Sequence, residues 1–365
     1  MRCILVYVSI AISCTLNAAC AQTTLKGSWE QPVHSIEQQV AEWLQDNNVP
    51  SVSIAVLQGG ELAWAGTFGE QSTGRPAKNS TLYNVASLTK PITAELFLRL
   101  AQAGDFQLDE PLWSYWTDPE IAGDPRHKWL TPRLSLSHQT GFPNWRQERA
   151  DGAFDIHWDP GTQFGYSGEG YHYAAKAAES KLRQSFDDLA NEHLFTPLRL
   201  SGISYVYQAD FEGHVASPKG PEGTYGDAPQ HLEWNAAGDV LATSTAYARF
   251  LLAVMNNEGL SHQFAARRYV IDHPGEENVC SEAYQACPVE VESGYALGWG
   301  VLAYRDETII MHRGGDWGIR SLAYFVQETG FGLVILTNGS NGEAVIRNVV
   351  EVFHANDHWL DILHK

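Results

Sequence analysis

A serine followed three residues later by a lysine is the first pattern in the sequence that could do chemistry. Ser87 and Lys90 occur in the segment ASLTK. Residues i and i+3 of a helix share one face, so a helix beginning near Ala86 would bring the lysine amine to the serine hydroxyl. Lysine can take the serine proton when burial or a neighbouring positive charge lowers its pKa. A capped helix with a solvated lysine explains the segment as well, so the pattern needs support from elsewhere.

Two other segments offer that support. Tyr166 lies in the glycine-rich segment GTQFGYSGEGY, where a phenol could relay a proton. The segment MHRGGDWG places His312, Gly314 and Gly315 after a strand pattern. Glycine lets backbone N–H groups approach a substrate oxygen, as an oxyanion hole requires. A buried aromatic residue and a tight turn remain the alternative interpretations.

Taken in order, these motifs resemble the family of class C β-lactamases, D-alanyl-D-alanine carboxypeptidases and related esterases and D-aminopeptidases. The serine-lysine motif, the tyrosine motif and the His-x-Gly motif all have counterparts there. The stretches LSLSHQTGFP, WDPGTQFGYS, AAGDVLATSTAYARF and YALGWG are also similar to the family, and the likeness covers residues 35–357.

The resemblance implies roles for individual residues. Ser87 would attack a carbonyl and form an acyl-enzyme, with Lys90 activating it and Tyr166 sharing the acid/base work. The backbone N–H groups of Ser87 and Gly315 would hold the oxyanion. His312 would orient Tyr166 or the substrate. No metal or cofactor is implied.

The sequence departs from the family pattern at two motif positions. Gly168 stands where the family has an asparagine whose amide contacts the substrate, and His312 stands where many members have lysine. Arg313 could restore the charge, although neighbouring strand residues point to opposite faces. We therefore expect an esterase or a peptide or amide hydrolase rather than a true β-lactamase or D,D-peptidase. A catalytically weakened binding or sensor protein is the alternative from another class.

Further residues are expected to contact a small ester, amide or peptide substrate. Besides Gly168 and Arg313, these are Gly314 and Trp317. Large aromatic side chains often line binding pockets. The tryptophans beside the motif segments that could form the floor of the pocket are Trp145, Trp158, Trp299 and Trp317.

Strand patterns occur at both ends of the chain and helical patterns in the middle. We expect helices over 34–48, 244–257 and 343–354, a hairpin over 51–69, and strands over 295–304, 307–314, 320–327 and 331–339. This predicts an α+β fold with an antiparallel sheet flanked by terminal helices. The expected lobes are an α/β lobe, 22–86 plus 258–365, and a helical lobe, 87–257.

The first residues and the cysteines indicate an exported protein. Residues 1–21 have the charge, apolar run and small residues of a cleaved signal peptide, with a lipid anchor on Cys20 as the alternative. Cys280 and Cys287 are then expected to form a disulfide, with two free thiols as the alternative. A net charge of -19 argues against nucleic acid and anionic membranes as partners.

Two other interpretations of the motifs are weaker. GYSGE nearly spells the G-x-S-x-G elbow with Ser167 as nucleophile, but Glu169 replaces the final glycine. His354 and His358 have the spacing of a zinc-binding pair, but they lack the intervening glutamate and a third ligand. Cationic residues at a helix C-terminus are the simpler interpretation of these histidines.

Overall fold

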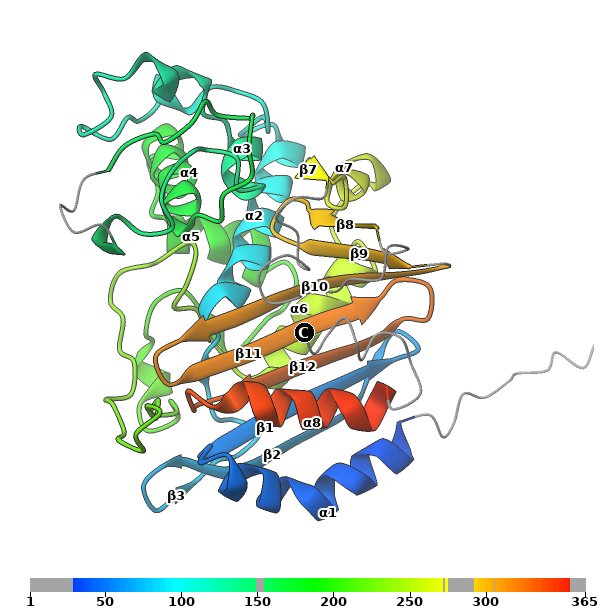
Figure 1. The fold of residues 1–365 in the computed structure, drawn as a ribbon. Coiled ribbons are helices and arrows are strands. Elements are labelled where there is room, and N and C mark those ends of the chain that lie inside the picture. Colours follow the sequence, from blue (N-terminus) through cyan, green and yellow to red (C-terminus); the bar gives the residue numbers. More distant parts are fainter. Residues whose placement is uncertain (1–28, 149–153, 272, 275–291, 305, 355–365) are drawn as a thin grey trace, which may run out of the picture.

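The computed structural model describes residues 29–148, 154–271, 273–274, 292–304 and 306–354. The main-sheet strands are β1 (Ser51–Gln58), β2 (Glu61–Ser72), β3 (Arg75–Pro76), β7 (His273–Pro274), β8 (Glu292–Tyr295), β9 (Gly300–Tyr304), β10 (Glu307–Asp316), β11 (Ile319–Val326) and β12 (Phe331–Thr337). They form one nine-stranded sheet in the order β3-β2-β1-β12-β11-β10-β9-β8-β7. β1 pairs antiparallel with β12, so both ends of the chain build the sheet, as the sequence predicts (Figure 1).

The helices either cover a face of this sheet or belong to the separate helical part of the molecule (Figure 1). They are α1 (Glu30–Asp46), α2 (Thr89–Ala103), α3 (Pro132–Leu136), α4 (Gly168–Leu182), α5 (Phe186–Ala190), α6 (Ser244–Met255), α7 (His262–Arg267) and α8 (Gly342–His354). Helices α1 and α8 lie side by side on one face, and α6 lies behind the sheet in the view of Figure 1. The α+β architecture with flanking terminal helices is therefore confirmed.

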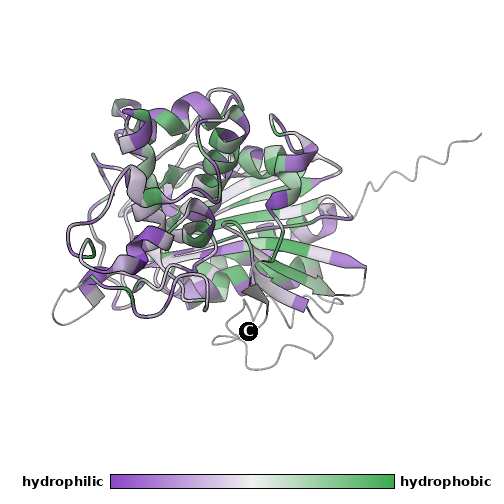
Figure 2. Cartoon of the chain, turned by 90° about the horizontal axis from the view of Figure 1, so that it is seen from above, coloured by the Kyte–Doolittle hydropathy of each residue, from purple (hydrophilic) through white to green (hydrophobic). Residues whose placement is uncertain are grey.

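Alternate residues of β1 enter two separate hydrophobic cores. Ile54 and Val56 pack with α1 and α8, whereas Ala55 and Leu57 join the core shared with α2 and α6. Side chains alternate across a strand, so a strand covered on both faces is apolar throughout. In Figure 2 the strands accordingly carry many green bands, with pale stretches between them and purple toward several strand ends.

Two turns that shape the sheet contain glycines with a left-handed backbone conformation. Gly59 and Gly60 have φ of 62° and 80°, the left-handed values of the two-residue turn expected between β1 and β2. The predicted strand 295–304 is instead two strands, because Gly298 turns with φ of 76°. A Cβ on Gly298 would lie 2.5 Å from that of Ala94, so this turn packs closely on α2.

A small second sheet anchors the segment that leads into α2. It consists of β4 (Tyr83–Asn84), β5 (Ile203–Ser204) and β6 (Leu241–Ala242), in the order β4-β6-β5. β4 comes just before Ser87, and β6 comes just before α6. The sheet therefore ties the serine segment to a helix that packs on the main sheet.

Several sequence predictions lie outside the described residues. These are the leader (1–21), the anchor on Cys20, the Cys280–Cys287 disulfide and His358; His354 is the last residue of α8, and its side chain is not described. Among the described residues, no helix is both long and apolar enough to cross a membrane.

A buried ion pair yields a stability prediction. The side chains of Arg268 and Glu95 are both 0% exposed, and Nη2 of the arginine lies 2.9 Å from Oε2 of the glutamate. Glu95→Gln would leave the guanidinium buried without a counter-charge. We expect it to lower the free energy of unfolding by about 3–5 kcal/mol in denaturant titrations.

The exposed pair Arg249–Glu258 provides the control, since its side chains are 40% and 35% exposed. Glu258→Gln should lower the free energy of unfolding by less than about 1 kcal/mol. Equal effects of the two substitutions would contradict the role given to the buried pair.

Candidate active site

Ser87 lies in a tight turn that the surrounding structure holds in place. Residues Ala86–Leu88 form a 3₁₀ turn that runs directly into α2. Ala86 has a φ of 47°, a left-handed value that alanine rarely adopts. Its N–H donates to Oδ1 of Asn84 at 2.7 Å, and its carbonyl accepts from Thr89 Oγ1 at 2.7 Å. Backbone strain held by such contacts is common where a side chain must be presented to a substrate.

Lys90 is buried one turn after the serine, as the i, i+3 spacing predicts. Its Nζ lies 3.0 Å from Ser87 Oγ and donates to the carbonyl of Ala237 at 2.9 Å. The side chain is 1% exposed. Burial lowers the pKa of Lys90 from 10.5 to about 7, although the charge of Asp239 opposes this shift. Near neutral pH a large fraction of the amine is therefore uncharged and able to accept the serine proton.

Tyr166 stands beside this pair at the edge of the site. Its ring centroid lies 4.6 Å from Lys90 Nζ and 4.2 Å from the ring centroid of His138. Burial of the hydroxyl raises the pKa of Tyr166, while a hydrogen bond with Ser87 acts in the opposite direction. The phenol therefore keeps its proton at neutral pH. The residue is still 36% exposed, so it borders solvent rather than lying in the core.

His312 reaches the same site but carries no charge there. Its Nδ1 donates to the carbonyl of Arg313 at 2.6 Å, and the hydroxyl of Tyr295 donates to its Nε2 at 2.8 Å. Burial, followed by the nearby charge of Lys90, lowers the pKa of His312 to about 3. Its ring centroid is 6.4 Å from that of Tyr166. Both ring nitrogens are thus occupied by protein groups, and contact with Tyr166 is through packing.

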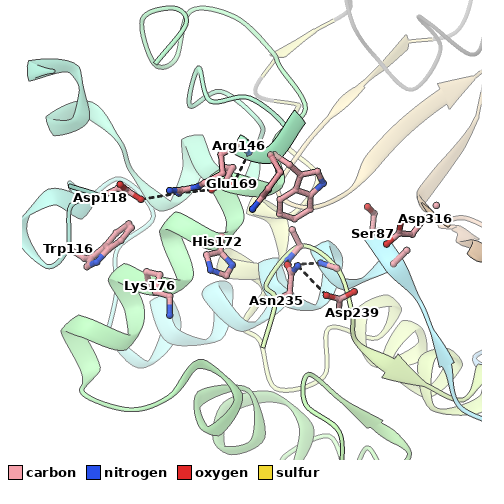
Figure 3. Close-up of a pocket in the computed structure, with 16 residues that line it drawn as sticks. Ser87, Trp116, Asp118, Arg146, Glu169, His172, Lys176, Asn235, Asp239 and Asp316 are labelled. Carbon is pink, nitrogen blue, oxygen red and sulfur yellow. Dashed lines mark hydrogen bonds and ion pairs between the residues drawn. The ribbon is translucent and has the colours of Figure 1, made fainter. Parts of the chain in front are cut away.

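A cavity of about 600 Å³ opens from Ser87, and we call it the Ser87 cavity. Ser87 and Asp316 line one end, whereas Trp116 and Lys176 line the other end (Figure 3). Gly315 also lines the cavity, as an oxyanion site built from the N–H groups of Ser87 and Gly315 requires. The side chains between these ends include those of Trp145, Arg146, Glu169, His172, Asn235 and Asp239. Within the described parts of the chain, no group of three or more His, Cys, Asp or Glu residues is arranged to hold a metal ion.

Three residues expected to contact substrate lie elsewhere. Arg313 points toward α8, where its Nη1 lies 2.5 Å from Oε1 of Glu343. Gly314 is buried, and a Cβ there would lie 2.4 Å from the carbonyl oxygen of Val85. Trp317 is 52% exposed in the turn after β10 and lines a neighbouring hollow, not the Ser87 cavity. None of the three is among the residues that line the Ser87 cavity, and their contact with a substrate stays a prediction.

The tryptophan prediction is correct for one residue out of four. Trp145 lines the Ser87 cavity and covers Gly168. Trp158 packs over Gly165, outside this cavity. Trp299 is fully buried and stacks on Phe250 with ring centroids 6.3 Å apart.

Ser167 is a helix cap rather than a nucleophile. Its Oγ accepts a hydrogen bond from the N–H of Gly170 at 3.0 Å and donates to the carbonyl of Pro143 at 2.8 Å. The residue is 0% exposed. An N-terminal cap of this kind satisfies a helix N–H group that lacks an internal partner, and the hydroxyl does not reach a substrate.

Sequence reasoning missed several groups around the site. His138 lies 0% exposed against Tyr166, and its Nδ1 accepts from the N–H of Ser167 at 3.0 Å. Asp239 faces Lys90 from a left-handed backbone with φ of 75°. Tyr295 holds His312. His138 and Asp239 lie in the segments LSLSHQTGFP and AAGDVLATSTAYARF, whose only signal in the sequence is a likeness to the family. No rule of residue spacing predicts that these segments contact Lys90 or Tyr166.

Comparisons with known proteins agree with this geometry. The Beta-lactamase family matches residues 35–355. Protein flp of Staphylococcus aureus strain MW2 is 23% identical over 314 residues, covering 81% of this chain and 61% of the relative. The chain thus spans about six-tenths of the length of such curated relatives, here 60–61%.

Solved structures share the fold. The octameric penicillin-binding protein homologue from Pyrococcus abyssi has a TM-score of 0.70 at 20% identity, covering 85% of this chain and 74% of that one. A class C beta-lactamase has a TM-score of 0.69 at 19% identity, covering 88% and 96%. The chain therefore belongs to the Beta-lactamase family of serine hydrolases, and the resemblance inferred from its motifs is confirmed.

The shifted pKa of Lys90 predicts how activity depends on pH. The lysine acts as a base only when neutral, so kcat/KM for an uncharged ester should rise about tenfold per pH unit below 7 and level off above it. His312, with a pKa of about 3, stays neutral from pH 5 to 9 and adds no inflection in that range. Initial rates corrected for spontaneous hydrolysis measure the profile.

Asp239→Asn tests the electrostatic part of this prediction. Removing a negative charge that raises the pKa of Lys90 should move the inflection to lower pH. An inflection near the ordinary lysine pKa in the unaltered protein, or a shift upward in the variant, would contradict the assignment.

Proposed function

We propose that the protein is an exported serine hydrolase that cleaves ester or amide bonds through an acyl-enzyme on Ser87. The observation that carries the proposal is the buried amine of Lys90, 3.0 Å from Ser87 Oγ with a pKa of about 7. Perturbed titratable groups beside a nucleophile in a cavity are a recurrent feature of catalytic sites. The signal-like residues 1–21 support export.

The proposed reaction has two stages. Lys90 accepts the proton of Ser87 Oγ as that oxygen bonds to the substrate carbonyl carbon, and the N–H groups of Ser87 and Gly315 stabilise the oxyanion. Tyr166 delivers a proton to the leaving group as its bond to carbon breaks, and is reprotonated from Lys90. In the second stage a water gives a proton to Lys90 as its oxygen bonds to the acyl carbon. The bond between that carbon and Ser87 Oγ then breaks, the acid is released, and Lys90 returns the proton to Ser87 Oγ.

The charges at the site favour substrates without a carboxylate beside the scissile bond. His312 is neutral, and Arg313 is paired with Glu343 on the other face of β10. Arg146, farther along the cavity, is bound by three carboxylates, those of Asp118, Glu120 and Glu169. β-Lactams and D,D-peptides carry such a carboxylate, so we favour carboxylesterase or peptidase-like activity over class C-like β-lactamase or D,D-peptidase activity.

A catalytically weakened binding or sensor protein is the second candidate. The observation in its favour is Gly168, which supplies no side-chain amide to a substrate. Such a protein would be acylated at Ser87 but would not release the product. Turnover therefore separates the two candidates.

Substitution of the nucleophile tests the proposal directly. Ser87→Ala should reduce hydrolysis of p-nitrophenyl esters by on the order of a thousandfold or more, and should abolish labelling by a fluorophosphonate probe. Mass spectrometry of the labelled protein should place the adduct on Ser87.

Ser35→Ala is the matched control, because Ser35 is only partly buried in α1 and its hydroxyl donates locally to the carbonyl of Gln31. It should keep full activity. Hydrolysis by Ser87→Ala within a few-fold of the unaltered protein would refute the hydrolase assignment, and labelling without turnover would favour the sensor.

A further inference from the structure

Trp145 occupies the space that a side chain at position 168 would need. A Cβ built on Gly168 would lie 2.4 Å from Cη2 and 2.5 Å from Cζ2 of the indole. The backbone does not require glycine there, because Gly168 is the first residue of α4 and is not among the residues with a left-handed φ. Glycine is also among the least favoured residues in a helix. Space, rather than conformation, therefore accounts for the glycine.

Asn144 and Arg146, the two residues that flank Trp145 in the chain, are both hydrogen-bonded to the first turn of α4. The carbonyl of Asn144 accepts the N–H groups of Gly168 and Glu169, both at 3.1 Å. The N–H of Arg146 donates to Oε1 of Glu169 at 3.1 Å, and its guanidinium binds Oε2 at 2.9 Å. Residues 144 and 146 are thus joined to the first turn of α4, and these bonds fix the backbone of Trp145 beside Gly168.

The indole belongs to the wall of the cavity that an acyl group on Ser87 would enter. Trp145 lines the Ser87 cavity, and so do His172 and Lys176 on α4, which lie away from Ser87 (Figure 3). The indole atoms that fill the space beside Gly168 are carbons. Where the family pattern has an amide side chain, this chain thus has ring carbons, which neither accept a hydrogen bond from an amide N–H nor donate one to an amide carbonyl.

We propose that the Trp145–Gly168 pair selects the acyl group: it favours esters with a hydrocarbon chain next to the scissile carbonyl over esters with an acylamido group there. The proposal rests on the proposed function, with Ser87 as nucleophile. An amide buried against the ring carbons beside Gly168 loses its water partners and gains none from those carbons. The expected penalty on kcat/KM is on the order of ten- to a hundredfold.

Two p-nitrophenyl esters of equal chain length test this selection. The pentanoate has a hydrocarbon acyl chain, whereas the N-acetylglycinate places an amide N–H and carbonyl at the corresponding positions. Each kcat/KM is divided by the rate of spontaneous hydrolysis of the same ester, which removes the difference in intrinsic reactivity. The selection ratio is the normalised value for the pentanoate over that for the N-acetylglycinate.

Four proteins form a double-mutant cycle: the unaltered chain, Trp145→Ala, Gly168→Asn and the double variant. Trp145→Ala should lower the selection ratio about tenfold, because water can then reach the substrate amide. Gly168→Asn alone should reduce kcat/KM for both esters by about tenfold or more, because the new side chain displaces the indole. In the Trp145→Ala background Gly168→Asn should instead raise hydrolysis of the N-acetylglycinate, lowering the ratio by a further tenfold or so.

Trp158→Ala is the matched control. Trp158 covers Gly165 as Trp145 covers Gly168, with a Cβ on Gly165 lying 2.3 Å from the indole Cζ2, but it does not line the cavity. This variant should leave the selection ratio unchanged. A fall in the ratio equal to that of Trp145→Ala would mean that loosening of the loop is responsible, and would overturn the proposal.

The remaining outcomes distinguish a failure of the selection by Trp145 from a failure of the proposed function. If both esters are hydrolysed and the ratio is the same in all four proteins, or if Gly168→Asn has equal effects in both backgrounds, the selection by Trp145 is refuted alone. If neither ester is hydrolysed and the fluorophosphonate does not label Ser87, the proposed function fails, and this inference fails with it. If the Gly168→Asn variant does not fold, the selection ratio of the double variant can still be compared with that of Trp145→Ala, and an equal ratio in these two proteins would refute the selection.

Discussion

The proposed chemistry depends on an amine that the fold has removed from water. Lys90 is 1% exposed, and burial moves its pKa from 10.5 to about 7. Without that shift the amine would be protonated near neutral pH and could not accept the proton of Ser87. Several distant segments create the burial: α2 carries the lysine, the loop at Ala237 provides a carbonyl partner, and the rings of Tyr166 and Tyr171 cover the amine.

The histidine beside the nucleophile contributes no positive charge to the site, and this shapes which substrates the site suits. The buried His312 is neutral because the low-dielectric surroundings and Lys90 both oppose its protonation. Gly168 and Trp145 replace a polar group near the nucleophile with an apolar surface. Together these features favour neutral acyl groups, whereas the polar groups farther along α4 leave room for a longer substrate.

The sequence predicts the elements better than it predicts the contacts between them. Hydrophobic periodicity and the Gly59–Gly60 turn located the hairpin and the terminal helices, and the i, i+3 spacing placed Lys90 beside Ser87, because these are local effects. Local rules cannot locate Asp239, which meets Lys90 from more than a hundred residues away in the chain, or reveal that Trp145 fills the space beside Gly168. Strand alternation did indicate that Arg313 would point away from the site, but Trp317 looked equally suitable and lies in an exposed turn.

The most direct test is a measurement of the pKa of Lys90 itself. Protein labelled with ¹³C at the lysine Cε would be titrated by NMR from pH 5 to 11, and the Lys90 signal would be assigned by its loss in Lys90→Arg. A buried base predicts a midpoint near 7 for this signal, well below that of the solvated lysines. A midpoint near 10.5, the ordinary value, would show that the amine is charged at neutral pH and cannot activate Ser87.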